Sequence, residues 1–444
     1  MLYMESIEIE VISNETIKPS APTPESLCMY PLSFLDQLSP STFMPLVYFY
    51  AKDGKISNAE RSKALKSSLS QVLTTFYPMS GRVKDDELHV FCNDQGVPFI
   101  EAIANCKLSE VIKSPVPREL NKFHAYQLWD AREYHIVMAV QVTFFRCHGM
   151  AVGLLINHRI ADALSFFMFA NAWAAAARNE YDDMPRPIFE SAAVIFPARQ
   201  DVAMYRRGMM LQEELVCKIF TFPASKISIL RDRYADTTDN VFTKPRRPTR
   251  VEALSAFIWS RFIVAKELKL PDPNKMFTVL HAVNLRTRMD PPLSEYYFGN
   301  ICCFTIATPN MEGSDSDQAA GRQLVQQIRE SIRGVNGEYI EKLREGEQYL
   351  NFLKKRATQC YKNELVTLNF TSLCRFPLYE ADFGWGKPVL VGSASLTYKN
   401  IVTFLDTPSG EGIEAWICMT KQDMEKFEED FELKDFLSVK TAGG

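Results

Sequence analysis

Residues 136–157 read IVMAVQVTFFRCHGMAVGLLIN and contain two runs that are rich in apolar and β-branched residues. The runs extend from Ile136 to Phe145 and from Met150 to Asn157, and only four residues separate them. Two such runs joined by a short turn predict a pair of neighbouring strands. The stretch from Ala163 to Arg178 is apolar on all sides, which is typical of a buried helix. Strands followed by a buried helix indicate a mixed α/β fold.

The rest of the chain continues this alternation of strands and helices. A capping box at Ser57–Glu60 predicts a helix that ends before Pro78, and a second box at Thr249–Glu252 opens another helix. Further elements are expected as strands over 277–285, 301–307, 401–405 and 413–419, with a polar helical region over 315–353.

A segment rich in proline divides the chain. Six prolines lie between Asp182 and Pro248, with only a weak strand over 216–222. Such a segment predicts a linker between two halves. We therefore expect an N-terminal domain over 1–185, a linker or crossover over 186–248 and a C-terminal domain over 249–444.

The overall composition excludes several classes of protein. The chain has 444 residues, 46% of them hydrophobic and 23% charged, with a net charge of −4. A slightly acidic chain has no basic field to attract nucleic acid or an acidic membrane. No apolar run reaches the roughly 18 residues of a transmembrane helix. The acidic N-terminus, with Glu5, Glu8 and Glu10, lacks a signal-peptide layout, so we expect a cytoplasmic protein.

The ten cysteines carry no metal-binding or redox pattern. None forms C-x-x-C, and none lies near a histidine pair at metal-ligand spacing. In a cytoplasmic chain, cysteines in apolar stretches are expected to be buried free thiols. We predict no disulfide and no metal site.

His158 and Asp162 form the first candidate site. Of six histidines, only His158 has an acidic residue four positions later. His158 follows a buried strand, and strand ends in α/β folds are where ligand crevices open. The alternative is that Asp162 only caps the following helix and that His158 is a core histidine. The spacing alone leaves both interpretations open.

Other kinds of catalytic chemistry lack their motifs. The chain has no G-x-S-x-G nucleophile elbow, no phosphate-binding glycine loop and no H-E-x-x-H. What remains is a histidine without its own nucleophile beside it. Such a base suits activation of a substrate hydroxyl or amine.

The second candidate motif is the run Asp382 to Pro388, which reads DFGWGKP. Its two glycines flank a tryptophan and imply a tight backbone turn. A purely structural turn, with the aspartate paired to an arginine, is the alternative to a catalytic role.

Together these two motifs resemble those of the plant BAHD acyltransferases. His158–Asp162 carries the H-x-x-x-D pattern and Asp382–Gly386 the DFGWG pattern, in the order and at the distance of that family. The resemblance spans essentially the whole chain and is strongest with the branch that acylates alkaloid and terpenoid alcohols. It also includes Pro22–Pro24, Leu35–Gln37, Phe76–Arg82, Cys92–Gly96, Thr249–Glu252 and Ala282–Arg286.

The resemblance implies a fold and a reaction. The fold is two similar-sized α/β domains, each like chloramphenicol acetyltransferase, with mixed sheets and a solvent channel between them. The reaction is acyl transfer, most readily of acetyl, from acyl-CoA to a hydroxyl of a plant specialised metabolite. His158 is then the general base. No permanently bound cofactor is implied, and a monomer is expected.

The resemblance also assigns supporting roles. Asp162 supports the loop geometry through an arginine, and Asp382 is structural and pairs with an arginine, for which Arg286 is the candidate. Trp385 is a candidate oxyanion donor through its indole N–H.

A basic loop provides the candidate site for the acyl donor. Arg246 and Arg247 lead into the helix capped at Thr249, with Arg250 in its first turn. Arginines beside a helix N-terminus suit the phosphates of CoA. A solvated surface loop is the alternative.

The identity of the donor and the type of acceptor stay open. Tyr297–Ile301 is one residue short of a pattern common in malonyl-transferring members, so malonyl-CoA could replace acetyl-CoA as the donor. The acceptor could also be an amine, which would give an amide. A non-catalytic relative that binds a ligand on the same scaffold is a further hypothesis.

Overall fold

The computed structural model divides the chain into two units that are not continuous in sequence. The first contains 1–209, 293–301 and 375–397, and the second contains 210–292, 302–374 and 398–444. Within these units the structure describes 7–52, 56–83, 88–126, 135–190, 194–200, 202, 214–236, 246–267, 276–308, 317–362, 365–396 and 398–438.

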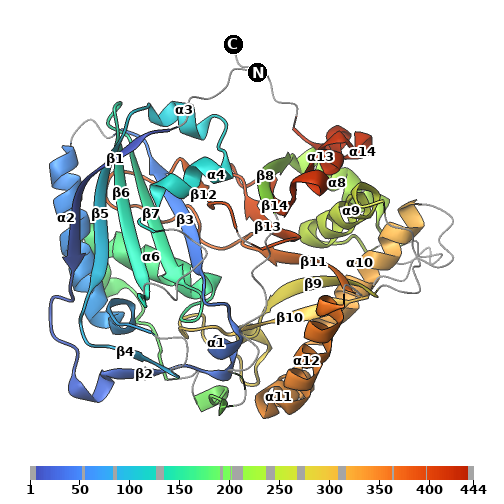
Figure 1. The fold of residues 1–444 in the computed structure, drawn as a ribbon, viewed down its shortest axis with the longest axis horizontal. Helices are drawn as coiled ribbons and strands as arrows, with labels where there is room; N and C mark the ends of the chain where they lie inside the picture. Colours follow the sequence, from blue (N-terminus) through green and yellow to red (C-terminus); the bar gives the residue numbers. More distant parts are fainter. Residues whose placement is uncertain are drawn as a thin grey trace. The chain divides into compact units, whose positions relative to one another are not determined.

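The first unit is built on a mixed six-stranded sheet with the order β1-β5-β6-β7-β3-β12 (Figure 1). Its strands are β1 (Ile9–Ile17), β3 (Phe43–Tyr50), β5 (Val97–Ala104), β6 (Met138–Phe145), β7 (Met150–Asn157) and β12 (Leu390–Gly392). A smaller sheet pairs β2 (Met29–Pro31) with β4 (His89–Phe91). The helices are α1 (Phe34–Leu38), α2 (Asn58–Thr75), α3 (Leu108–Ile112), α4 (Pro117–Leu120) and α6 (Ala163–Ala177).

The predicted strand pair and helix at the centre of this unit are confirmed. Strands β6 and β7 are antiparallel, and every residue of both is buried. Helix α6 begins at its N-cap Asp162 and is buried along most of its length. It packs against α2, and the Trp173 indole N–H donates to the Leu65 carbonyl (3.1 Å). The capping box at Ser57 that predicted α2 is present.

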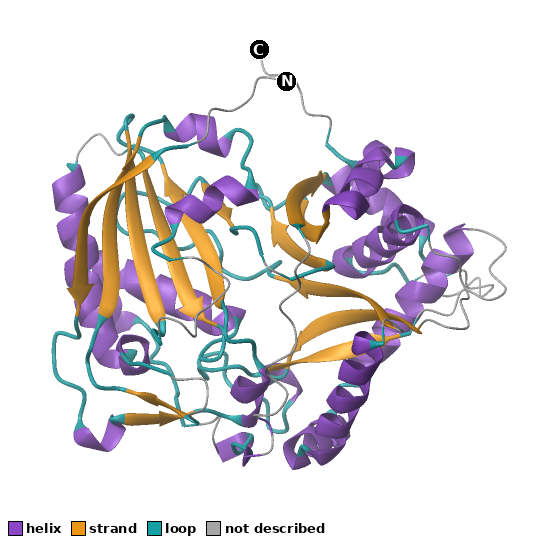
Figure 2. Cartoon of the chain, viewed as in Figure 1, coloured by secondary structure: helices purple, strands orange, loops and turns teal. Residues whose placement is uncertain are grey.

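The second unit has its own mixed six-stranded sheet, with the order β10-β9-β11-β13-β14-β8 (Figure 1). Its strands are drawn in orange and its helices in purple in Figure 2. Its strands are β8 (Leu215–Phe222), β9 (Met276–Asn284), β10 (Cys302–Ala307), β11 (Leu365–Ser372), β13 (Ile401–Asp406) and β14 (Ile413–Thr420). Its helices are α8 (Ala224–Arg233), α9 (Arg250–Ala265), α10 (Asp317–Arg333), α11 (Gly337–Glu345), α12 (Glu347–Tyr361), α13 (Lys421–Glu429) and α14 (Phe431–Phe436). A single apolar core joins side chains of the sheet to those of α8, α9, α10 and α13.

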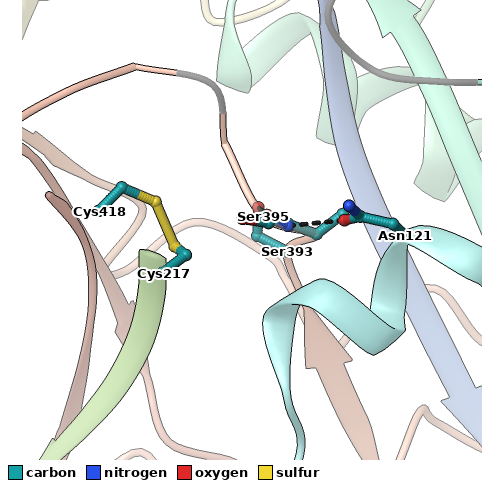
Figure 3. The surroundings of a disulfide bond; sticks show 6 residues. Asn121, Cys217, Ser393, Ser395 and Cys418 are labelled. Atoms are coloured by element: carbon teal, nitrogen blue, oxygen red, sulfur yellow. Dashed lines mark hydrogen bonds between the residues drawn. A yellow bond between two sulfur atoms is a disulfide. The ribbon is translucent and has the colours of Figure 1, made fainter. Parts of the chain in front are cut away.

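The division into units differs from the domain boundaries expected from sequence. Much of the expected linker is structured, because β8 pairs with β14 over its whole length. The segment 375–397 belongs to the first unit, since β12 pairs with β3 and the Ser395 amide donates to Asn121 (2.9 Å; Figure 3). Composition reveals a proline-rich segment, but it does not reveal which distant strand a short segment will pair with.

The prediction of free cysteines throughout is wrong at one pair. Cys217 on β8 and Cys418 on β14 form a disulfide (Figure 3). The strand register places the two residues directly opposite each other, with Cα atoms 4.1 Å apart. The sequence separates them by 201 positions, so no spacing rule points to the pair. Free thiols are found at Cys28, Cys92, Cys106, Cys147, Cys302, Cys303 and Cys374.

Candidate active site

His158 lies immediately after β7, the strand between β6 and β3 in the sheet of the first unit. Its backbone N–H donates to the Thr42 carbonyl (2.9 Å), just before β3 begins. The Asn157 backbone N–H donates to the Val137 carbonyl (2.8 Å) on the other side. The backbone of His158 is therefore fixed at the end of a buried strand.

The imidazole of His158 differs from those of the core histidines. His158 is partly exposed, whereas His124 and His281 are buried. The Nδ1 atoms of all three are buried and have no hydrogen-bond partner among the described residues. Burial lowers the pKa of His158, and the nearby negative charge of Asp162 opposes that shift only in part. By contrast, full burial lowers the pKa of His124 and of His281 to about 3. The core interpretation fits those two histidines, whereas His158 is partly exposed and its lowered pKa favours the neutral imidazole, the form that can accept a proton.

Asp162 fixes the other end of the loop that follows His158. One carboxylate oxygen accepts from the Ser165 amide (2.9 Å) and caps α6, and the other accepts from the Ile301 amide (3.2 Å). The capping interpretation of Asp162 is thus correct, and it is compatible with a supporting role beside His158. The predicted pairing of Asp162 with an arginine stays a prediction.

Asn300 connects the loop to a second buried carboxylate. Its side-chain N–H₂ group donates to the His158 carbonyl (2.7 Å) and to Asp36 Oδ1 (2.8 Å). Its backbone N–H also donates to Asp36 Oδ1 (2.9 Å). Asp36 and Asn300 are at most 1% exposed. A chain of hydrogen bonds therefore runs from a carboxylate near the N-terminus to the backbone of the candidate base.

Asp36 is held by four donors in an apolar interior. Besides the two from Asn300, its Oδ2 accepts from the Ser33 backbone N–H (2.8 Å) and hydroxyl (2.7 Å). Burial nevertheless raises the pKa of Asp36 to about 6. Asp36 and Asn300 lie in two segments that resemble the family, Leu35–Gln37 and Tyr297–Ile301, but the sequence alone predicts no role for either residue. The sequence feature that points to Asp36 is its place in the run FLDQL, beside apolar residues. Burial of a charged side chain is costly unless hydrogen bonds or a charged partner compensate it, so such an aspartate is a candidate for a specific role.

The DFGWG segment forms a turn that Asp382 holds together. The Asp382 Oδ1 atom accepts from the backbone N–H groups of Gly384 (2.8 Å) and Gly386 (2.9 Å). Both glycines have positive φ, +105° and +98°, which side chains disfavour. Arg178 donates to the main-chain carbonyl of Asp382 rather than to its carboxylate. The predicted pair with Arg286 stays a prediction, since Arg286 belongs to the second unit.

The structure does not bring Trp385 to His158. Its indole contacts the Tyr50 ring at 6.3 Å, and the Arg61 guanidinium lies over it at 5.8 Å. Tyr50 is at the far end of β3, whereas the start of β3 adjoins His158. At about 3.3 Å per residue, β3 separates its two ends by about 23 Å. The expected oxyanion role of Trp385 is therefore corrected, because local sequence cannot tell which end of a strand a distant turn will meet.

The residues expected to bind CoA lie around the start of α9 in the second unit. Thr249 caps the helix by accepting from the Glu252 amide (3.1 Å). Arg247 pairs with Asp232 (2.7 Å), and Arg250 pairs with Asp406 (2.8 Å). Arg246 borders a surface pocket of about 540 Å³. Lys244, a further basic residue two positions before Arg246 in the sequence, falls outside the described residues.

A partly exposed, neutral histidine at a strand end, with two buried carboxylates holding the loop beside it, is an arrangement that suits acid–base catalysis. Within the described parts of the chain, no three metal-ligating side chains come together. The model of the Transferase family matches residues 7–434, and the chain belongs to this family, the BAHD acyltransferases. It is an acyl-CoA-dependent O-acyltransferase.

Relatives of known activity extend along the whole chain. Stemmadenine O-acetyltransferase of Catharanthus roseus is 35% identical over 431 residues, covering 96% of this chain and 97% of that protein. Limonoid 21-O-acetyltransferase of Melia azedarach is 35% identical over 438 residues, covering 97% and 99%. The crystal structure of vinorine synthase superimposes with a TM-score of 0.80 at 33% identity, covering 97% of this chain and 99% of that one. The expected fold class is confirmed by this similarity.

Proposed function

We propose that this chain transfers an acetyl group from acetyl-CoA to a hydroxyl of a plant alkaloid or terpenoid. The names of the relatives support acetyl transfer to such acceptors. The single observation that carries the proposal is the state of His158. It is partly exposed, its pKa is lowered by burial, and its backbone is fixed on both sides.

In the proposed reaction, the neutral imidazole of His158 takes the proton of the acceptor hydroxyl while the oxygen attacks the thioester carbonyl. The tetrahedral intermediate then collapses with cleavage of the C–S bond. The imidazolium returns the proton to the departing thiolate, so the products are the ester and CoA. Asp162 and Asn300 contribute by holding the loop, and neither takes part in proton transfer.

The donor is proposed to bind at the basic loop before α9. Arg246, Arg247, Thr249 and Arg250 are the candidate contacts for the phosphates of CoA. Since Arg247 and Arg250 already pair with carboxylates, Arg246 is the cation of this group that is most available to a new anion. An arginine without a carboxylate partner suits bidentate binding of phosphate.

The donor, the acceptor, the oligomeric state and the location in the cell are likewise proposals. Malonyl transfer, amide formation on an amine acceptor and a non-catalytic ligand-binding relative are the alternatives to acetyl transfer. The described residues include no helix that is long and apolar enough to cross a membrane. We propose a cytoplasmic monomer, which size-exclusion chromatography and localisation of a tagged protein would check.

The decisive test is turnover with a panel of donors and acceptors. Acetyl-CoA, malonyl-CoA and a plant metabolite extract are incubated with the protein, and mass spectrometry detects a gain of 42 or 86 Da. His158→Gln is expected to lower kcat by about 10²–10⁴. His89→Gln removes a histidine from the same unit and is the matched control. Equal turnover by wild type and His158→Gln would refute His158 as the base.

A further inference from the structure

Four of the eight residues that line the pocket beside Arg246 are arginines. Its volume is about 540 Å³, within the usual range for small-molecule sites. It lies entirely in the second unit, between Asp236 and Arg246, which precede α9 in the sequence, and one face of α10. We name it the arginine pocket and define it by its charged residues Asp236, Arg246, Arg322, Arg329, Glu330 and Arg333.

The acidic residues of the arginine pocket are already engaged. Asp236 pairs with the buried Arg329 (3.4 Å), which also pairs with Glu252 (3.3 Å). Glu330 accepts a hydrogen bond from Gln326 (2.8 Å). Arg329 is thereby connected to the capping box of α9, because its partner Glu252 also accepts from the Thr249 amide.

Three arginines of the pocket are left without such partners. Within the described parts of the chain, no carboxylate lies within ion-pair distance of Arg246, Arg322 or Arg333. Arg329 and Arg333 are also four residues apart on α10, a spacing at which like charges repel. The charged residues that define the pocket are four arginines and two carboxylates, so its net charge is +2 in a chain whose net charge is −4. This creates a local positive potential that favours an anion.

We infer that the arginine pocket binds the phosphate monoester of a small ligand. Guanidinium groups match phosphate oxygens with paired N–H donors, and a dianionic phosphate compensates more charge than a carboxylate does. Two sources carry this chemistry. One is the 3′-phosphate of the CoA donor, in which case the inference rests on the proposed function, and the other is a separate phosphorylated metabolite.

The test measures binding to the full chain by calorimetry. The probes are adenosine 3′,5′-bisphosphate, inorganic phosphate and, as the uncharged reference, adenosine. The double variant Arg322→Gln/Arg333→Gln removes two cations from the pocket. The control Lys342→Gln/Arg344→Gln removes two cations from the exposed face of α11. KM is measured in parallel for acetyl-CoA and for its 3′-dephospho analogue.

The bisphosphate is expected to bind wild type and control alike, and the pocket variant about 100-fold more weakly, about tenfold for each guanidinium removed. A higher KM of the pocket variant for acetyl-CoA, but not for the dephospho analogue, supports the donor's 3′-phosphate as the ligand. An unchanged KM with weakened phosphate binding supports a separate phosphorylated ligand. Equal binding to wild type and pocket variant, or equal binding of adenosine and the bisphosphate, overturns the inference. Absence of turnover with any donor would contradict the proposed function instead and leave the calorimetric result standing.

Discussion

Replacing Asn300 with alanine should separate positioning of the base from stability of the fold. The change removes two hydrogen bonds of the side chain, one to the Asp36 carboxylate (2.8 Å) and one to the His158 carbonyl (2.7 Å). A buried bond to a charged acceptor contributes about 1.5–3 kcal/mol and one to a neutral carbonyl about 0.5–1.5 kcal/mol. The free energy of unfolding should therefore fall by about 2–4 kcal/mol. Because a misplacement of about 1 Å can cost about 10² in rate, kcat should fall by about 10- to 100-fold.

Ser33→Ala is the matched control for this prediction. It removes the N-cap of α1 and the hydroxyl donor to the other oxygen of Asp36 (2.7 Å), whereas Asn300 is the residue that holds the His158 carbonyl. Its loss of stability should be similar, about 2–4 kcal/mol, but its kcat should stay within about twofold of wild type. Urea denaturation gives the stabilities, and initial rates at saturating substrates give kcat. Near-normal kcat in Asn300→Ala, or an equal loss of kcat in Ser33→Ala, would refute the positioning role.

Further expected outcomes concern pH, the disulfide and the DFGWG turn. Since the pKa of Asp36 is raised from 3.8 to about 6 in the folded chain, its contribution to stability should be greatest below pH 4 and decrease by about 3 kcal/mol as the pH rises through 6, and Asp36→Asn should lack this slope in denaturation curves. Because burial lowers the pKa of His158, kcat/KM should fall with decreasing pH only below the ordinary histidine value of 6.5, and the same profile with a second acceptor that does not titrate would exclude ionisation of the acceptor as the cause. Dithiothreitol should lower the melting temperature of wild type but not of Cys217→Ser, and identical responses would argue against a cross-link between Cys217 and Cys418. Asp382→Ala should lower the melting temperature by a few degrees while kcat stays within about twofold, so a large loss of kcat at normal stability would contradict its structural role.

Local patterns are sufficient to predict the elements that carry the base. The capping boxes at Ser57 and Thr249 mark the starts of α2 and α9, and both side chains make the expected bonds. The two apolar runs around residue 147 form the antiparallel pair β6 and β7. In each case a few neighbouring residues determine the conformation through their own hydrogen bonds or through the period of their apolar side chains. His158 and Asp162 are predictable for the same reason, because they are four positions apart.

Features that depend on pairing between distant segments are not predictable in this way. The disulfide depends on the register of β8 against β14, and the location of the DFGWG turn depends on the pairing of β12 with β3. A strand's sequence specifies which of its faces is buried, but many strands present the same alternation and are therefore equivalent as partners. The error about Trp385 has this origin. The motif itself is recognisable in the sequence, but the end of β3 that it adjoins follows only from the fold.

The support of the base shows why such distant contacts matter for function. Asp36 is 264 positions from Asn300, and Asn300 is 142 positions from His158, yet each pair shares a hydrogen bond shorter than 3 Å. An isolated buried carboxylate would destabilise the fold, because burial disfavours the charged form. The pKa of Asp36 is raised for the same reason. Four donors offset most of it, and two of them come from the one residue that also holds the His158 carbonyl. Any movement of the His158 loop that carries Asn300 with it would leave a buried charge with fewer donors. The free-energy cost of losing these hydrogen bonds to Asp36 therefore opposes displacement of His158. In this way a residue that does not touch the substrate can restrict the position of the imidazole.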